Sequence, residues 1–269
     1  MLKRTVITVG LGFMGGWFAT LFSLPLAWML GSLFMVMGLS LMGVKTGVDK
    51  RVHRTAIALL GLFIGSRIQA DELVGLVLWY PSVLAMLVYM GLMLIGGFWI
   101  FNRARVGRMN AIFCSYPGSM NSALVLAERA NGDLRWIAIS HSLRLVTVVS
   151  GAAFVASFFV DDVALASSPS ALALVDILPL LLAPLCWWLA RLLRIPLPEF
   201  LGPMAAGAII ANLGFDYSLP TGVVLAAFLV LGASVGSRFS GTQWSQVVSM
   251  GRYGITFALF ALVVAALMA

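Results

Sequence analysis

The stretch LGLFIGSR at residues 60–67 decides the fold, because it returns as LGASVGSR at residues 231–238. Working outward, the match continues at a constant offset of 171 positions through shared apolar, proline and glycine residues: Leu24-Pro25-Leu26 with Ile195-Pro196-Leu197, Leu30-Gly31 with Leu201-Gly202, and Gly43 with Gly214. Proline, glycine and arginine shared in one register without a gap indicate an internal duplication. The GxxxG pairs Gly61/Gly65 and Gly232/Gly236 are expected to allow close helix packing.

The composition is that of an integral membrane protein. Mean hydropathy is +1.03, and 61% of the residues are hydrophobic. Only 10% of the residues are charged, against about 25% in soluble domains. The apolar stretches are close to the roughly 20 residues that a helix needs to cross a bilayer, and they are too long for barrel strands. We therefore expect an all-α protein embedded in a membrane.

Nine apolar stretches are expected to be spans, at residues 5–22, 24–43, 54–70, 73–101, 134–160, 172–190, 196–214, 220–237 and 243–269. A further apolar segment, 109–128, is interrupted at YPGS, where proline and glycine break a helix. The predicted fold is a polytopic transmembrane helical bundle of about nine spans plus one re-entrant broken helix. Lys3 and Arg4 precede the first span without a small-residue cleavage site after it, so we expect a retained helix.

The loop charges predict that the two copies face opposite sides of the membrane. Basic residues are retained in cytoplasmic loops. The first copy has such residues after its second span, and the second copy does not: Lys45, Lys50, Arg51 and Arg54 correspond to Asp216, Thr221, Gly222 and Leu225. This indicates an inverted-topology repeat with a cytoplasmic N-terminus. It also favours a hairpin at 109–128 over a full span, since most of the 17 Lys and Arg residues then stay inside.

The duplication divides the chain into two unequal repeats. The first, at 1–170, contains five spans and the re-entrant hairpin 109–128, and the second, at 171–269, is truncated to four spans. At the constant offset, the second repeat has no counterpart of the hairpin or of the span at 134–160. A neighbouring copy of the chain would cover the apolar face that this leaves, so we expect a homodimer.

The stretch SYPGSMNSALVLAERANGDLRWIAISHSLRLVTVV at 115–149 resembles the AbrB family of bacterial membrane proteins. That family carries a duplicated module with an LPxPxxLG-type motif, an IGxxIG-type helix, a Pro-Gly segment, an acidic turn and a Q/H-x-x-R helix. The LPxPxxLG-type motif corresponds to LPLAWMLG and IPLPEFLG, and the IGxxIG-type helix corresponds to LGLFIGSR and LGASVGSR. The Pro-Gly segment is PGSMNSALVLAE, the acidic turn is NGD, and the Q/H-x-x-R motif is HSLR. This chain departs from the pattern in having Gly118-Ser119 where Gly-Gly is usual. The resemblance implies a location in the bacterial inner membrane. Family labels divide between ammonia monooxygenase and regulator of gene expression.

Polar residues gather at the break in 109–128. Backbone groups freed by proline and glycine persist in a bilayer only when they are buried in protein or line a polar cavity. The substrate-binding candidates are the residues of the break and its flanks: Ser115, Tyr116, Pro117, Gly118, Ser119, Asn121 and Ser122. They suit a small polar or anionic solute. A tight structural turn between two half-helices is the open alternative.

His141 and Arg144 are further candidates, since residues three apart share a helix face. Arg144 lies about ten residues into its span, where a guanidinium costs at least a few kcal/mol and needs acceptors. We expect it to face the Pro117-Gly118 break and to join the solute site with His141, with a purely structural arginine as the alternative. Asp176 is a candidate for ion coupling, or else it faces interfacial water.

Inverted repeats, a broken helix and a charge near the midplane are parts of secondary transporters, so we expect a carrier of a small polar or anionic solute. The alternative is a membrane-embedded protein that regulates gene expression indirectly through partners. An enzyme is not expected, because the His and Cys residues assemble no metal centre for oxygen chemistry: His53, His141, Cys114 and Cys186. We predict no cofactor, no metal and no nucleic-acid partner. The expected partners are the lipid bilayer, the solute and a second copy.

Overall fold

The structure is a computed structural model, and it describes residues 2–68, 80–118, 120–159, 174–213, 215, 217 and 219–268. Within these ranges, the side chains of residues 2, 121, 156–159 and 174–181 are not described. Ser119 lies outside the described residues, as does Asp216, which entered the comparison of loop charges.

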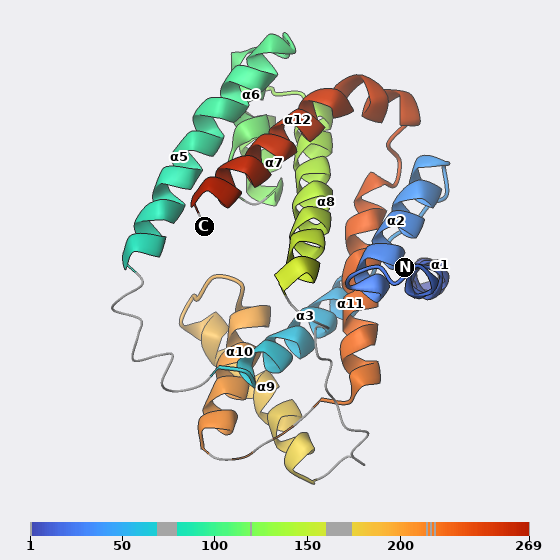
Figure 1. The fold of residues 1–269 in the computed structure, drawn as a ribbon, viewed down its shortest axis with the longest axis vertical. Helices are drawn as coiled ribbons and strands as arrows, with labels where there is room; N and C mark the ends of the chain where they lie inside the picture. Colours follow the sequence, from blue (N-terminus) through green and yellow to red (C-terminus); the bar gives the residue numbers. More distant parts are fainter. Residues whose placement is uncertain are drawn as a thin grey trace. The chain divides into compact units, whose positions relative to one another are not determined.

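The described residues form helices and loops without a strand, which confirms the all-α prediction. The helices, coloured along the chain in Figure 1, are α1 (Leu2–Leu21), α2 (Ala27–Leu41), α3 (Lys50–Gly65), α5 (Tyr80–Arg103), α6 (Arg108–Ser115), α7 (Met120–Arg129), α8 (Leu134–Phe159), α9 (Leu174–Leu192), α10 (Pro198–Asn212), α11 (Thr221–Gly236), the short η2 (Ser237–Phe239) and α12 (Trp244–Met268). Each stretch expected to be a span corresponds to one helix. The bounds differ by a few residues, as where α3 begins at Lys50 instead of residue 54.

Four helical segments among the described residues are long and apolar enough to cross a membrane: Tyr80–Arg103, Leu134–Val155, Thr221–Phe239 and Trp244–Met268. Two apolar helices are shorter, Ala27–Leu41 and Leu182–Leu192. The chain therefore has the helices of a membrane protein, and the count of nine spans stays a prediction.

The chain folds into two compact units. Unit 1 contains α1, α2, α3, α9, α10 and α11, from Met1–Leu39, Lys45–Val77 and Ser157–Ser237. Unit 2 contains α5, α6, α7, α8 and α12, from Ser40–Val44, Leu78–Ala156 and Arg238–Ala269. The units are a division by packing. The predicted repeats at 1–170 and 171–269 are a division by sequence, and they stay a prediction.

In unit 1 the helices keep the sequence offset of 171 positions. Helices α2 and α10 begin and end at corresponding residues, and so do α3 and α11. The turns before α2 and α10 also correspond. Ser23 and Leu26 have φ of 51° and 47°, and Arg194 and Leu197 have φ of 55° and 51°. Residues other than glycine rarely adopt this region, so the two copies share an unusual backbone as well as a sequence.

Glycine pairs bring helices of the two copies together in unit 1. Four glycines each lie so close to a backbone carbonyl of the facing helix that a Cβ would collide with it: Gly61 with Phe200, Gly65 with Met204, Gly232 with Met29, and Gly236 with Leu33. Helix α3 thus packs on α10, and α11 packs on α2 (Figure 1). The close packing expected from the GxxxG pairs is confirmed.

Unit 2 packs α5 against the broken helix and α12. Gly97 on α5 lies against Ser115 of α6 and Phe257 of α12. At the other end of α6, the Asn110 side-chain oxygen accepts a hydrogen bond of 2.9 Å from the backbone N–H of Asp133, which follows α7. The start of α6 and the end of α7 are therefore held together, so the segment folds back as a helical hairpin.

Candidate functional site

The hairpin is broken where the sequence has proline and glycine. Helix α6 ends at Ser115, Tyr116 is extended (φ −54°, ψ 123°), and α7 begins at Met120. Pro117 has no backbone N–H and disfavours a helical conformation at the residue before it. The last carbonyls of α6 and those of the break therefore lack helical partners. This confirms the break predicted at YPGS.

Arg144 on α8 supplies partners for two of these carbonyls. Its Nη1 donates to the Tyr116 carbonyl at 3.1 Å, and its Nη2 donates to the Gly118 carbonyl at 3.4 Å. The side chain is half-buried, so these acceptors replace part of the water that a guanidinium would otherwise bind. The prediction that Arg144 faces the Pro117-Gly118 break is confirmed.

His141 belongs to the same chain of hydrogen bonds. Its Nε2 lies 3.0 Å from the Phe113 carbonyl, and its Nδ1 lies 3.3 Å from Nη2 of Arg144. A carbonyl only accepts and a guanidinium only donates, so Nε2 carries the proton and Nδ1 accepts. The residue is only 4% exposed. His141 therefore ties α6 to the guanidinium and orients it.

Unit 2 contains a cavity of about 560 Å³, and residues of this hydrogen-bonded group line it together with residues of α5. The lining residues come from α5, the break, α7, α8 and η2: Met86, Tyr89, Met90, Met93, Pro117, Gly118, Met120, His141, Arg144, Leu145, Val148 and Arg238. Four predicted site residues meet here, namely Pro117, Gly118, His141 and Arg144. The hairpin and α8 thus form one polar wall.

The other predicted residues whose side chains the structure describes do not line this cavity. Ser115 is fully buried, and its hydroxyl donates to the Ala111 carbonyl of its own helix at 2.8 Å. Tyr116 contributes its carbonyl to Arg144, and Ser122 is exposed on α7. Ser119 and the side chains of Asn121 and Asp176 lie outside the described residues, so their roles stay predictions.

Arg238 is a cavity residue that the sequence analysis did not identify. It lies in η2 and lines the cavity together with Arg144, and the described lining contains no carboxylate. An arginine at the end of an apolar helix is ordinarily explained by snorkelling, so nothing in the sequence distinguished it. The methionines of α5 that line the cavity could have been found in the sequence, because Met86, Met90 and Met93 recur at the spacing of one helix face.

The described residues offer hydrogen-bond donation and soft apolar contact. Within the part of the chain that the structure describes, no three His, Cys, Asp or Glu side chains gather as a metal site would require. The two guanidinium groups provide the charge, and thioether and aromatic side chains provide the walls.

Comparisons with known proteins extend over most of the chain. Residues 28–269 match the profile of the family described as "Transition state regulatory protein AbrB". The chain is also similar to "Putative regulator AbrB" of Escherichia coli (strain K12), with 26% identity over 226 residues. That alignment covers 80% of this chain and 64% of the relative, so the chain spans less than two thirds of the relative's length. No solved structure matches. Because the family profile covers most of the sequence, the chain belongs to the AbrB family.

Proposed function

We propose that the chain is a membrane carrier that binds a small anionic solute in the unit 2 cavity. The observation that carries this proposal is the pair of guanidinium groups, Arg144 and Arg238, in a cavity whose described lining contains no carboxylate. An anion that enters such a cavity is attracted by both charges. Guanidinium groups also match carboxylate and phosphate oxygens geometrically, with two parallel hydrogen bonds.

Arg144 uses some of its N–H donors for contacts within the protein and keeps others for a ligand. Three hydrogen bonds hold it to Tyr116, Gly118 and His141, and a guanidinium has five N–H donors. The remaining donors serve a solute. The volume of about 560 Å³ lies within the range of small-molecule sites. Methionine side chains adapt to apolar shapes, so the solute class is a small organic anion.

The carrier role draws its support from the hairpin. Secondary transporters place broken helices and polar groups at the membrane midplane, where the freed backbone groups meet the substrate. We propose that the hairpin is re-entrant and that both its ends lie on the cytoplasmic side. The hydrogen bond between Asn110 and Asp133 supports this arrangement, since it joins the two ends of the hairpin.

We further propose nine spans in an inverted repeat, with a cytoplasmic N-terminus, in the bacterial inner membrane. The shared helix bounds of the two copies support the repeat, and the unequal loop charges support its inversion. Single cysteines at the corresponding positions Arg51 and Gly222, in a chain with Cys114 and Cys186 replaced by alanine, test the inversion. An impermeant thiol reagent added to intact cells should label Gly222→Cys and not Arg51→Cys. Labelling of both or of neither contradicts the inversion.

A second candidate function is indirect regulation of gene expression through partner proteins in the membrane. The observation in its favour is the description of the family and of its relative as regulators. Neither candidate requires catalysis, and we propose that the chain is not an enzyme. We also propose that the chain assembles as a homodimer. The test measures transcript levels in a strain from which the gene for this chain has been deleted. If the Arg144→Leu variant restored these levels as fully as the wild-type chain does, the regulator would be favoured.

Ligand-dependent thermal unfolding of the purified full chain tests the anion site. The panel contains monocarboxylates, dicarboxylates, organic phosphates and, as charge controls, amines. A ligand that binds the native state raises the melting temperature, so at least one anion should stabilise the wild type, and amines should not.

Arg144→Leu should abolish the shift, and Arg252→Leu, which removes an exposed charge on α12 outside the cavity, should keep it. Uptake of the same anion by proteoliposomes then distinguishes a carrier from a receptor. The proposal fails if no anion stabilises the chain or if both variants keep the shift.

A further inference from the structure

Unit 1 contains a cavity of its own, of about 520 Å³, between α3, α9 and α10. Its lining changes character along α3. Arg51 and Arg54 lie in the first turns of that helix, whereas Leu59 and Leu62 line the cavity one to two turns further on. On α9, Ala183 and Pro184 continue the apolar wall. The cavity is therefore amphipathic, with its charge at the end where α3 begins.

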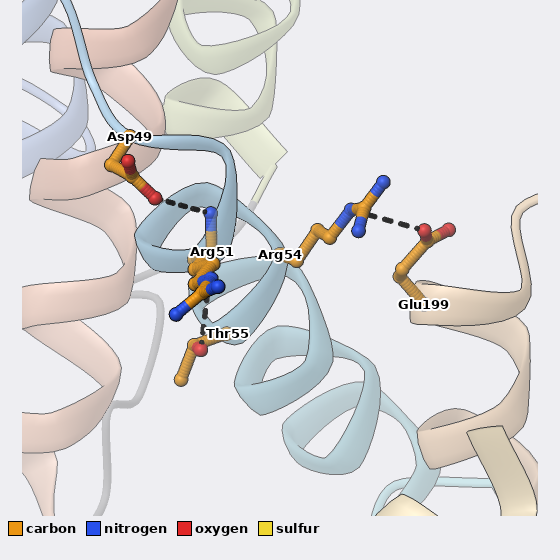
Figure 2. Close-up of polar contacts among 5 residues, drawn as sticks. All are labelled: Asp49, Arg51, Arg54, Thr55 and Glu199. Carbon is orange, nitrogen blue, oxygen red and sulfur yellow. Dashed lines mark hydrogen bonds and ion pairs between the residues drawn. The ribbon is translucent and has the colours of Figure 1, made fainter. Parts of the chain in front are cut away.

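The charged end carries a net positive charge. Nε of Arg54 lies 3.3 Å from a carboxylate oxygen of Glu199, and Figure 2 shows this ion pair bridging α3 and α10. Among the described residues, this pair leaves both Nη groups of Arg54 and the whole guanidinium of Arg51 to other acceptors. Asp49, also in Figure 2, accepts from the backbone N–H of Arg51 at 2.8 Å and so caps α3. Two arginines and one glutamate line this end.

Trp187 adds a donor within the cavity wall. It lines the cavity, and its indole Nε1 is buried without a hydrogen-bond partner among the described residues. Buried polar groups without a partner are rare in native structures, and each calls for an explanation. An acceptor on a bound molecule would satisfy this N–H.

The outer face of α9 indicates which molecules surround the cavity. Leu185, Trp188, Leu189 and Leu192 are exposed on that helix, whereas Ala183 and Ala190 are buried. An apolar exposed face on a membrane protein contacts lipid, so lipid molecules are available beside this cavity at high local concentration.

We propose that this cavity binds one anionic phospholipid, with its phosphate at Arg51 and Arg54 and an acyl chain along the apolar wall. The ester carbonyls follow the phosphate along a phospholipid, and one of them accepts from the Trp187 indole. Basic pockets between membrane helices bind anionic headgroups in this way. Free phosphate uses only the charged end, and a zwitterionic lipid of the same chain length gains nothing from the surplus positive charge. The inference does not rest on the solute proposed for unit 2.

Native mass spectrometry of the purified full chain in detergent tests the proposal, with phosphatidylglycerol, phosphatidylcholine of the same acyl chains, and inorganic phosphate as probes. We expect one tightly bound phosphatidylglycerol, weaker phosphatidylcholine binding, and no competition from phosphate. The double variant Arg51→Gln/Arg54→Gln should bind phosphatidylglycerol about thirtyfold more weakly, the weight of two charges near a membrane surface. The control Lys45→Gln/Lys50→Gln loses the same charge from exposed residues that do not line the cavity, and it should bind as the wild type does.

Three outcomes of this experiment overturn the inference, and a further variant supplies a fourth. Equal loss in the two double variants shows general attraction to the basic loop. Equal affinity for the two lipids shows that the guanidinium groups do not recognise the headgroup, and competition by phosphate shows a site for the headgroup alone. If Arg51→Gln/Arg54→Gln does not fold, Ala58→Phe keeps the charges and fills the apolar end. It should exclude phosphatidylglycerol, and binding that persists in that variant contradicts the proposal.

Discussion

The two copies of the repeat have the same backbone and different charges. Helices α2 and α3 begin and end at the residues that correspond to α10 and α11, and each copy uses its glycine pair to approach the other. Arg51 and Arg54, however, correspond to Gly222 and Leu225. The shared residues include the glycines that close packing requires, whereas the two arginines at the charged end of the unit 1 cavity occur in the first copy alone. The two copies therefore have their packing glycines in common and differ in the charged residues that line the cavity.

An arginine that both copies share has acquired different surroundings. Arg67 lies over the ring of Phe63, with 5.3 Å between its guanidinium carbon and the ring centroid. Its counterpart Arg238 lines the cavity of unit 2. The position that corresponds to Phe63 is Ser234 in the second copy, so Arg238 has no such ring one turn before it. The aromatic residue is therefore present in the copy whose arginine stacks and absent from the copy whose arginine lines a cavity.

The largest expected effect concerns the shared glycines. Gly65→Ala places a methyl group against the Met204 carbonyl, and a backbone atom cannot move aside as a side chain can. We expect a loss of about 3 kcal/mol in the free energy of unfolding, and a similar loss for its counterpart Gly236→Ala. Gly222→Ala, with open space around the new methyl, should gain about 0.5–1 kcal/mol. Unfolding in detergent measures all three, and equal effects would contradict the packing role.

The next effect concerns α8, whose Arg144 binds the carbonyls of the break in the hairpin. Arg144→Lys keeps the charge but loses the planar fork that binds the Tyr116 and Gly118 carbonyls and that would bind the proposed solute. We expect anion affinity to fall about thirtyfold, equivalent to about 2 kcal/mol. Isothermal titration with the anion found by thermal unfolding measures it. If lysine preserved the affinity, charge alone would be sufficient and the geometric argument would be wrong.

A smaller effect should separate the two shared arginines. Arg238→Gln removes one charge from the unit 2 cavity, and we expect anion affinity to fall about fivefold, or about 1 kcal/mol. Arg67→Gln removes the same charge from the first copy, and it should leave anion affinity unchanged. The same titration measures both variants. Equal loss in the two would show that Arg238 acts through the overall charge of the chain.

The smallest effect lies between α10 and α11, where Tyr217 corresponds to Thr46 of the first copy. Its hydroxyl donates to the Leu62 carbonyl at 2.8 Å. That carbonyl keeps its bond of 3.0 Å from the Ser66 N–H, so Tyr217→Phe should cost only about 0.5–1 kcal/mol of unfolding free energy. Chemical unfolding at neutral pH measures this difference.

The pH dependence of that variant has a defined sign. Burial raises the pKa of Tyr217 to about 12, and a hydrogen bond with Ser66 opposes part of the rise. Because the folded pKa exceeds the ordinary value near 10, the unfolded state loses its proton first. The contribution of Tyr217 to stability is complete below pH 10 and is lost as the pH rises through 12. Tyr217→Phe should flatten the fall in stability across that interval, and an unchanged slope would contradict the burial argument.

Much of the fold was predictable because apolar length and repeat register are local properties of the sequence. The helix bounds follow from them, apart from details such as the start of α3, which Asp49 caps at residue 50. Arg144 was predictable because a guanidinium in an apolar helix needs acceptors and the break supplies carbonyls. Ser115 was placed in the solute site, but a helical serine can donate to its own backbone, and this one does. Arg238 was missed because only tertiary packing brings η2 to the cavity.

Asn110 closes the base of the hairpin from both sides. Its side-chain N–H donates to the Val106 carbonyl at 2.7 Å, while its oxygen accepts from Asp133 at 2.9 Å. Helices α6 and α7 are thus held at both ends of the hairpin, by Asn110 at the base and by Arg144 at the break. A displacement of the break therefore either tilts both helices together or breaks the hydrogen bond between Asn110 and Asp133. The Asn110 amide thus links the two ends of the hairpin at the end opposite to the break.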